Sequence, residues 1–327
     1  MVSVLAAAVV GCGGPAEWSV VIDDTELDSV LLSVSGDSLD TVWAVGGGLG
    51  TPGDALAIRR TAAGWETVAT GFEETLWWVW VAGPDDVFMV GEAGRIAHWD
   101  GSAITEMTSP TTSVLFGVWG ASPTDVWAVG GDPFGMGDTD VILHYDGSAW
   151  TAASVPMPEG VAFFKVWGTS ANDVWAVGQR GQIVHYDGSA WSHVASPTTS
   201  PLFTVAGNAS GDVWAVGGPP AVILRYDGSA WNEEPLPGPA SVLNGVAVSD
   251  LGEVQVVGAR GTKWWLGADG VWVDEFDAAP ADDLHAAWIG GDHVLAVGGN
   301  FNAPSGAARV GVLAYRGTSP PPTGLAR

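Results

Sequence analysis

One pattern repeats along most of this chain and constrains its fold more than any other feature. It reads Leu-Phe-x-Val-Trp-Gly, a polar turn, Asp-Val-Trp-Ala-Val-Gly, a variable loop, and Ile-x-His-Tyr-Asp-Gly-Ser-Ala-Trp. The clearest copies cover 115–150, 163–191 and 202–231, and divergent copies cover 31–65, 76–100, 243–272 and 284–315. The third residue of the second segment recurs at intervals of 45, 39, 48, 39, 41 and 40 residues. Such a period, with several short strands per unit, indicates a propeller rather than a helical solenoid.

Each copy predicts four short strands. In the third copy they cover 115–119, 126–129, 141–145 and 149–152, and all are rich in β-branched or aromatic residues. These strands are apolar on both faces, as expected for sheets that pack between neighbouring sheets. The seven copies therefore predict an all-β chain with a single domain over residues 12–317, a seven-bladed β-propeller with four-stranded blades.

The two ends of the repeat array predict how the ring closes. The seventh copy stops near Tyr315 without a fourth strand, and a Pro-rich tail follows over residues 318–327. A segment at the other end of the chain, 17–21, matches the missing strand. We expect the Trp18 region to complete the last blade, which closes the ring and removes open sheet edges.

The chain is strongly acidic, with 37 acidic against 11 basic residues and a formal net charge of −26. Only two of the basic residues are lysines, Lys165 and Lys263. Such a charge repels phosphate backbones and excludes nucleic acid as a partner. Three sources of the acidity are open, namely adaptation to high salt, binding of divalent cations and turn chemistry. The recurrence of aspartates at fixed repeat positions favours turn chemistry.

The N-terminus predicts export. An uncharged apolar run, 2–11, precedes Cys12, the chain's one cysteine, and Gly13 follows it. This resembles the lipobox of bacterial lipoproteins, in which a signal segment, here 1–11, is removed and the cysteine carries lipid. The resemblance implies an extracytoplasmic protein, lipid-anchored to a cell-envelope membrane or secreted, that contacts membrane only through Cys12. The alternative is a buried N-terminal strand with an incidental cysteine.

The repeats also resemble known propeller families. A diglycine after the second strand (46–47, 130–131, 217–218 and 298–299), then a Tyr-Asp pair and a Trp, resembles kelch-type repeats. The fuller pattern is similar to repeats of uncharacterised secreted and lipid-anchored bacterial proteins, especially of myxobacterial type. Kelch-type radical-copper oxidases need a Cys-Tyr crosslink, and the sole cysteine falls in the signal region. The resemblance therefore implies the fold and no activity.

Most chemically conspicuous side chains recur with the repeat, which favours a scaffold role. Fifteen of the 19 tryptophans occupy repeated positions. His98, His144 and His185 share one third-strand position, which favours packing over metal ligation. In a four-stranded blade, the second-to-third hairpins and the crossovers to the next blade emerge on one face. Length variation is concentrated there, so we expect binding residues on this variable-loop face.

Residues that depart from the repeat are the candidate site residues. The loop after the third copy's second strand holds Asp132, Asp138 and Asp140, which predict a calcium site as the one possible cofactor, against the alternative of a solvated acidic loop. The candidate ligand-binding residues on the same face are Trp77, Trp78, Arg180, Arg260, Asn300 and Asn302.

No nucleophile elbow, phosphate-binding loop or zinc motif is present in the sequence, so catalytic residues are unknown. The leading hypothesis is a monomeric binding or scaffold module with protein or glycan as its ligand. The alternative is a carbohydrate-active enzyme, a glycoside hydrolase or lyase, that uses acidic residues on the variable-loop face. Two carboxylates across a central pocket beside Trp77 or Trp78 would favour the enzyme.

Overall fold

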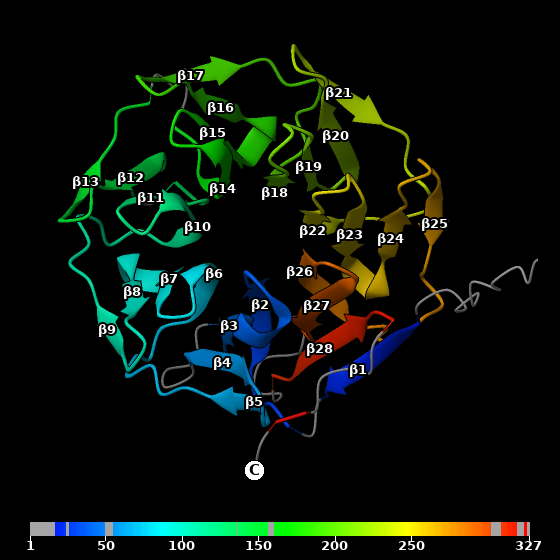
Figure 1. Cartoon of the computed structure of the whole chain (residues 1–327). Helices are drawn as coiled ribbons and strands as arrows, with labels where there is room; N and C mark the ends of the chain where they lie inside the picture. Colours follow the sequence, from blue (N-terminus) through cyan, green and yellow to red (C-terminus); the bar gives the residue numbers. More distant parts are fainter. Residues whose placement is uncertain are drawn as a thin grey trace, which may run out of the picture.

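The computed structural model describes residues 17–23, 26–49, 55–135, 137–155, 160–301, 309–318 and 324–325. Seven sheets, each of four antiparallel strands, stand around a central channel (Figure 1). The first strand of each sheet lies next to the channel and the fourth lies at the rim. This arrangement confirms the predicted seven-bladed β-propeller. No helix in the described ranges is both long and apolar enough to cross a membrane.

The strand bounds follow the repeat closely. Blades 1 to 4 are β2 (Val30–Ser35), β3 (Trp43–Gly47), β4 (Leu56–Thr61) and β5 (Gly64–Thr67); β6 (Leu76–Gly83), β7 (Asp86–Gly91), β8 (Ile96–Trp99) and β9 (Ile104–Glu106); β10 (Leu115–Ser122), β11 (Asp125–Gly130), β12 (Val141–Tyr145) and β13 (Trp150–Ala152); β14 (Phe163–Ser170), β15 (Asp173–Gly178), β16 (Ile183–Tyr186) and β17 (Trp191–Val194). Blades 5 to 7 are β18 (Leu202–Gly207), β19 (Val213–Gly217), β20 (Val222–Tyr226) and β21 (Trp231–Glu234); β22 (Leu243–Val248), β23 (Val254–Gly258), β24 (Lys263–Leu266) and β25 (Trp272–Asp274); β26 (Asp283–Gly290), β27 (His293–Gly299), β28 (Gly311–Arg316) and β1 (Trp18–Ile22).

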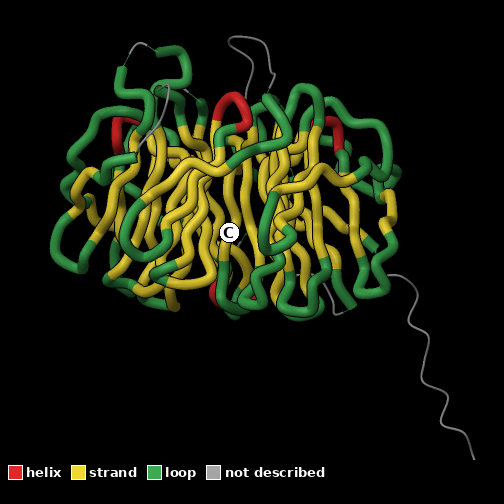
Figure 2. The backbone as a smooth tube through the Cα atoms, turned by 90° about the horizontal axis from the view of Figure 1, so that it is seen from above, coloured by secondary structure: helices red, strands yellow, loops and turns green. Residues whose placement is uncertain are grey.

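The strands run between the two faces of the disk, and the connections gather on those faces (Figure 2). Blades 2, 4 and 6 have a short 3₁₀ turn in the second-to-third hairpin: η2 (Glu92–Gly94), η3 (Gln179–Gly181) and η4 (Ala259–Gly261). A fourth turn, η1 (Leu39–Thr41), joins β2 to β3 and so lies on the opposite face.

The N-terminal strand closes the ring, as the orphan segment predicts. β1 pairs antiparallel with β28, with Trp18 opposite Arg316. The indole N–H of Trp18 donates to Oε2 of Glu275 at 2.9 Å, and Arg316 forms an ion pair with the same carboxylate at 2.9 Å. Strands from the two ends of the chain therefore share one blade and one polar cluster.

At three junctions, between blades 2 and 3, 3 and 4, and 4 and 5, a tryptophan of one blade covers a glycine of the next. The Trp-Gly pair of the first strand explains this contact, because the glycine leaves room for the ring from the preceding blade. A Cβ on Gly168 would lie only 2.8 Å from Cη2 of Trp119, and one on Gly120 would lie 2.7 Å from Cη2 of Trp80. The repeated tryptophans are thus packing residues, as their periodicity predicts.

The repeated histidines and aspartates also stabilise the scaffold. Nε2 of His144 lies 2.7 Å from Oδ1 of Asp125, which opens β11, and its ring packs 4.3 Å from Trp127, centroid to centroid. The same histidine–aspartate pair occurs in blades 2 and 4, as His98 with Asp86 and His185 with Asp173. In blade 5 an arginine takes the place of the histidine, and Arg225 bonds to Asp212. These side chains therefore bridge the second and third strands.

The turn between the third and fourth strands is built on an aspartate. Oδ1 of Asp146 accepts hydrogen bonds from the Ser148 and Ala149 backbone N–H groups and from the Ser148 hydroxyl. These bonds stabilise the ionised carboxylate and lower its pKa to about 2. The same bonds lower the pKa of Asp100 and Asp187 to about 2, and they lower that of Asp227 further.

Trp18→Ala is expected to weaken the closing blade. The substitution removes a 9%-exposed indole and its hydrogen bond to Glu275. Truncation of a buried tryptophan costs about 3–5 kcal/mol, which should appear as a lower melting temperature by circular dichroism. Val20→Ala, at a 41%-exposed position of the same strand, is the matched control and should change stability by at most about 0.5 kcal/mol. Equal effects would show that β1 does not stabilise the ring.

The aspartate turns are expected to lose their stabilising contribution in acid. Their folded-state pKa values lie below the unfolded value, so the contribution is complete above about pH 4 and is lost as the pH falls towards 2. A variant with asparagine at all four turn aspartates should show a smaller drop in melting temperature over this range. Four exposed carboxylates elsewhere provide the amide control: Glu73, Glu233, Asp250 and Asp277. An identical acid dependence in both variants would contradict the assignment.

Candidate functional site

Each first strand carries a one-residue bulge near its start. In blade 3, Leu115 pairs with Gly130 and Gly117 pairs with Val129, so the ladder skips Phe116. A bulge redirects the side chain of the extra residue, and here the redirected side chains surround the channel. The skipped residues of the seven blades are Leu32, Trp77, Phe116, Phe164, Phe203, Asn244 and His285.

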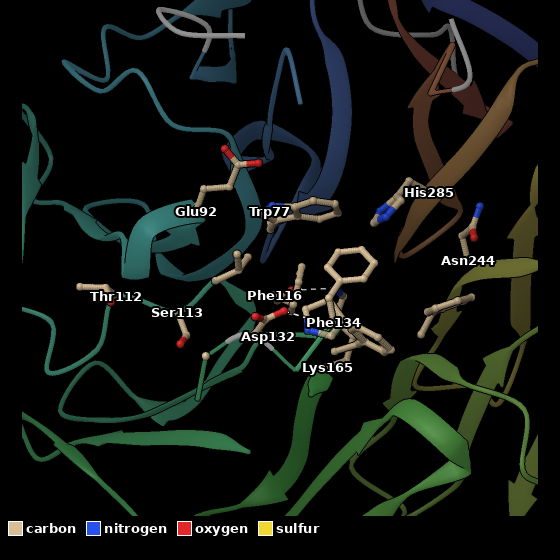
Figure 3. A pocket seen from close by; sticks show the side chains of 15 residues that line it. Trp77, Glu92, Thr112, Ser113, Phe116, Asp132, Phe134, Lys165, Asn244 and His285 are labelled. Atoms are coloured by element: carbon tan, nitrogen blue, oxygen red, sulfur yellow. Dashed lines mark hydrogen bonds between the residues drawn. The ribbon is translucent and has the colours of Figure 1, made fainter. Parts of the chain in front are cut away.

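Six of these seven residues line one cavity of about 730 Å³ at the channel mouth, on the variable-loop face (Figure 3). Four of them form a run of rings, here called the aromatic collar: Trp77, Phe116, Phe164 and Phe203. Adjacent ring centroids lie 5.1, 5.4 and 5.4 Å apart, and the first two contacts are edge-to-face. This geometry is favourable for aromatic pairs and gives the cavity an apolar wall.

A loop from blade 3 places a further aromatic ring at the cavity rim. Oδ1 of Asp132 accepts the Phe134 backbone N–H at 2.7 Å, and Nε2 of Gln179 donates to the Pro133 carbonyl at 2.8 Å. The first bond fixes the turn within the loop, and the second ties the loop to blade 4. The Phe134 side chain still lines the cavity although the residue is 83% exposed. An exposed ring held in this position is available for contact with a ligand.

A buried amine also belongs to the cavity wall. Lys165 in β14 is 3% exposed, and its Nζ donates to the Phe116 carbonyl oxygen at 2.8 Å. The same atom lies 3.8 Å from the ring centroid of Trp78, within range of a cation–π contact. Burial lowers the pKa of Lys165 to about 7, because the charged form loses its hydration.

Two more titratable groups line the cavity with shifted pKa values. Nδ1 of His285 lies 2.6 Å from the Leu32 carbonyl oxygen, which places a proton on Nδ1. Burial, with the nearby charge of Lys165, lowers the pKa of His285 to about 3, so the ring is neutral at pH 7. Burial raises the pKa of Glu92, in the hairpin turn next to Trp77. Shifted titratable groups in a cleft mark a candidate site.

Only part of the sequence-predicted site comes together. Trp77 and Asp132 line the cavity. Trp78 does not line it, but its ring packs against the Lys165 amine. Arg180 and Arg260 are exposed in the hairpin turns η3 and η4, and neither lines the cavity.

The remaining predicted residues hold loops, line another pocket or lie outside the described residues. The side-chain Oδ1 of Asn300 accepts the Val310 backbone N–H and so holds its own loop. Asp138 and Asp140 line a separate pocket from the one that contains Asp132. Within the described ranges, no group of three or more acidic, histidine or cysteine side chains is placed to hold a metal, and calcium stays a prediction. Asn302 and Cys12 lie outside the described residues.

Three of the four collar residues and Lys165 were not among the candidates predicted from the sequence. The phenylalanines at positions 116, 164 and 203 belong to the repeat consensus, and the candidate residues were taken from departures from that consensus. The bulge, which has no sequence signature of its own, turns them towards the channel. One signal was available: Lys165 is a lysine in an otherwise apolar first strand.

Several solved structures are similar to this chain over almost its whole length. A streptogramin B lyase structure aligns with a TM-score of 0.73 and 15% identity, covering 91% of this chain and 97% of that one. A catalytically inactive variant of virginiamycin B lyase from Staphylococcus aureus, with quinupristin, has a TM-score of 0.69 and 12% identity. This alignment covers 93% of this chain and 100% of that one. YCF48 bound to D1 peptide has a TM-score of 0.67 and 15% identity, and the alignment covers 94% of this chain and 98% of that one.

These similarities support the propeller fold. At such low identity they assign neither a family nor an activity to this chain. No protein-family model and no curated protein matches the chain. The resemblance to kelch-type and myxobacterial repeats therefore stays a prediction.

Lys165→Met is expected to stabilise the folded protein by an amount that depends on pH. The folded-state pKa of about 7 lies below the ordinary value of 10.5, so the penalty for a buried charge is full below pH 7 and fades towards pH 10. Methionine has a similar length and no charge. The melting temperature of the variant, relative to the original protein, should be highest at pH 6 and should fall as the pH rises to 10. A difference that stays constant over this range would contradict the burial of an ionisable amine.

Proposed function

We propose that this protein is an extracytoplasmic, lipid-anchored binding module whose channel mouth binds an apolar segment of a partner protein. The observation that carries the proposal is the aromatic collar, together with the exposed Phe134 ring that the blade 3 loop places over it. The lipobox-like segment ending at Cys12 supports the anchor. A binding or scaffold role is compatible with the range of proteins that share this fold.

The size and chemistry of the cavity favour apolar side chains as its occupants. A volume of about 730 Å³ lies within the range of ligand sites, which are mostly apolar with a few polar groups. The polar side chains of the inner ring already bond to the next blade: the Asn244 amide donates to the Leu284 carbonyl oxygen, and His285 bonds to that of Leu32. A glycan would need polar groups that face outwards, so a protein segment is the better fit.

Two of the similar structures contain ligands. Virginiamycin B lyase is described with quinupristin, and YCF48 with a D1 peptide. Propellers of this shape can therefore hold a ligand, which supports a binding role for this chain.

The second candidate, a carbohydrate-active enzyme, has one observation in its favour. Glu92 and Asp132 both line the cavity close to Trp77, and the raised pKa of Glu92 suits a general acid. However, Oδ1 of Asp132 holds the Phe134 backbone N–H, which gives this carboxylate a structural role.

Selection from a random peptide library on the immobilised full chain tests the binding proposal. Enriched peptides should carry aromatic or large aliphatic residues, and they should bind the Phe164→Ser variant about tenfold more weakly, because the peptide loses its contact with the Phe164 ring. Leu251→Ser removes an exposed apolar side chain from the opposite face and should leave affinity unchanged. Fluorescence polarisation with one labelled peptide measures both.

Two outcomes would contradict the proposal. Peptides that bind both variants equally would place the binding surface away from the collar. Degradation of a polysaccharide by the original protein, lost in Glu92→Gln, would favour the enzyme instead.

A further inference from the structure

The two lysines of the chain, both buried, have different surroundings. Nζ of Lys263 donates to the carbonyl oxygens of Gly261 and Pro280, each at 2.8 Å. Burial lowers the pKa of Lys263 to about 8, and the charges of nearby acidic residues oppose this shift. Lys165 has one hydrogen bond, to Phe116, and among the described residues it forms no ion pair. Only Lys165 lines the channel cavity.

The position of Lys165 depends on a glycine in the neighbouring blade. Gly117 occupies the same place in blade 3 as Lys165 does in blade 4. A Cβ on Gly117 would lie 2.9 Å from the Lys165 Cα, so glycine lets the inner strands approach closely. The lysine stem crosses this gap and brings Nζ to the Phe116 carbonyl, while the collar ring of the same residue faces the cavity. Lys165 therefore forms part of the cavity wall beside the aromatic rings.

We propose that Lys165 is a nucleophilic amine that captures an aromatic aldehyde or ketone in the cavity as a Schiff base. The neutral Nζ attacks the carbonyl carbon, a C–N bond forms, and the carbonyl oxygen leaves as water with the two amine hydrogens. No electrons are exchanged in this step, so no oxidant or reductant is needed. This activity goes beyond the proposed function, since it needs a small carbonyl compound and no partner protein.

The chemistry of the cavity suits this reaction. A lysine in an apolar pocket is a nucleophile because the ammonium form is disfavoured there. With a pKa of about 7, a large fraction of Lys165 is neutral near physiological pH, whereas an exposed lysine is almost entirely protonated. The collar rings supply edge-to-face contacts for an aromatic carbonyl compound. His285 is neutral and is protonated on Nδ1, which leaves its other ring nitrogen as a proton acceptor in the same cavity.

Reductive alkylation of the full chain tests the proposal. The protein is incubated with benzaldehyde and sodium cyanoborohydride, which supplies hydride to trap the imine, and the alkylated lysines are identified by peptide mass spectrometry. We expect Lys165 to react at least about tenfold faster than Lys263, with a rate that rises between pH 6 and 8. Lys263→Met should leave the Lys165 adduct unchanged, and Lys165→Met should abolish it.

A second measurement separates this inference from the proposed binding site. Binding of the neutral apolar dye N-phenyl-1-naphthylamine reports on the collar and should weaken in Phe164→Ser. If the dye binds in this way but Lys165 reacts no faster than Lys263, the Schiff-base inference is wrong and the binding site stands. If the dye binding is insensitive to Phe164 while Lys165 reacts selectively, the amine is confirmed as a nucleophile and the collar fails as a binding site.

Discussion

The structure depends on the contact between neighbouring blades, where the indole of one first strand covers a glycine of the next. Trp119 against Gly168 and Trp80 against Gly120 are two examples, and no larger residue fits at the glycine. Because each blade is packed between two others, its sheet faces are covered. Apolar residues on both sides of each strand follow from this arrangement, and so does the inner wall around the channel.

A ring of such contacts must close, and here the two ends of the chain close it together. The Glu275 carboxylate accepts from Trp18 and pairs with Arg316, so one blade 6 residue holds both strands of the closing pair. Leu325, near the C-terminus, adds a contact on the other side: its backbone N–H donates to the Glu26 carboxylate, and it forms an isolated β-bridge with Trp65. The join between the first and last blades is therefore held at several points.

The sequence predicted the fold well because packing repeats and repetition is visible. The blade number, the closing strand and the buried role of residues such as Trp127 follow from spacing alone. The cavity did not follow, because a bulge alters which side a residue faces without changing the residue types around it. Asp132 shows the same limit: its carboxylate holds Phe134 at the rim, and a count of acidic residues could not distinguish this from metal binding.

The bulge also separates two roles within a single strand. Residues on either side of it pair with the second strand of their own blade, while the skipped residue faces the channel and contacts the next blade, as the Asn244 amide does at the Leu284 carbonyl oxygen. There is one such position in each blade, and this chain varies them from Leu32 through aromatic rings to Asn244 and His285. Six of the seven line the same opening. Evolution could change what enters the channel by single substitutions that leave the architecture intact.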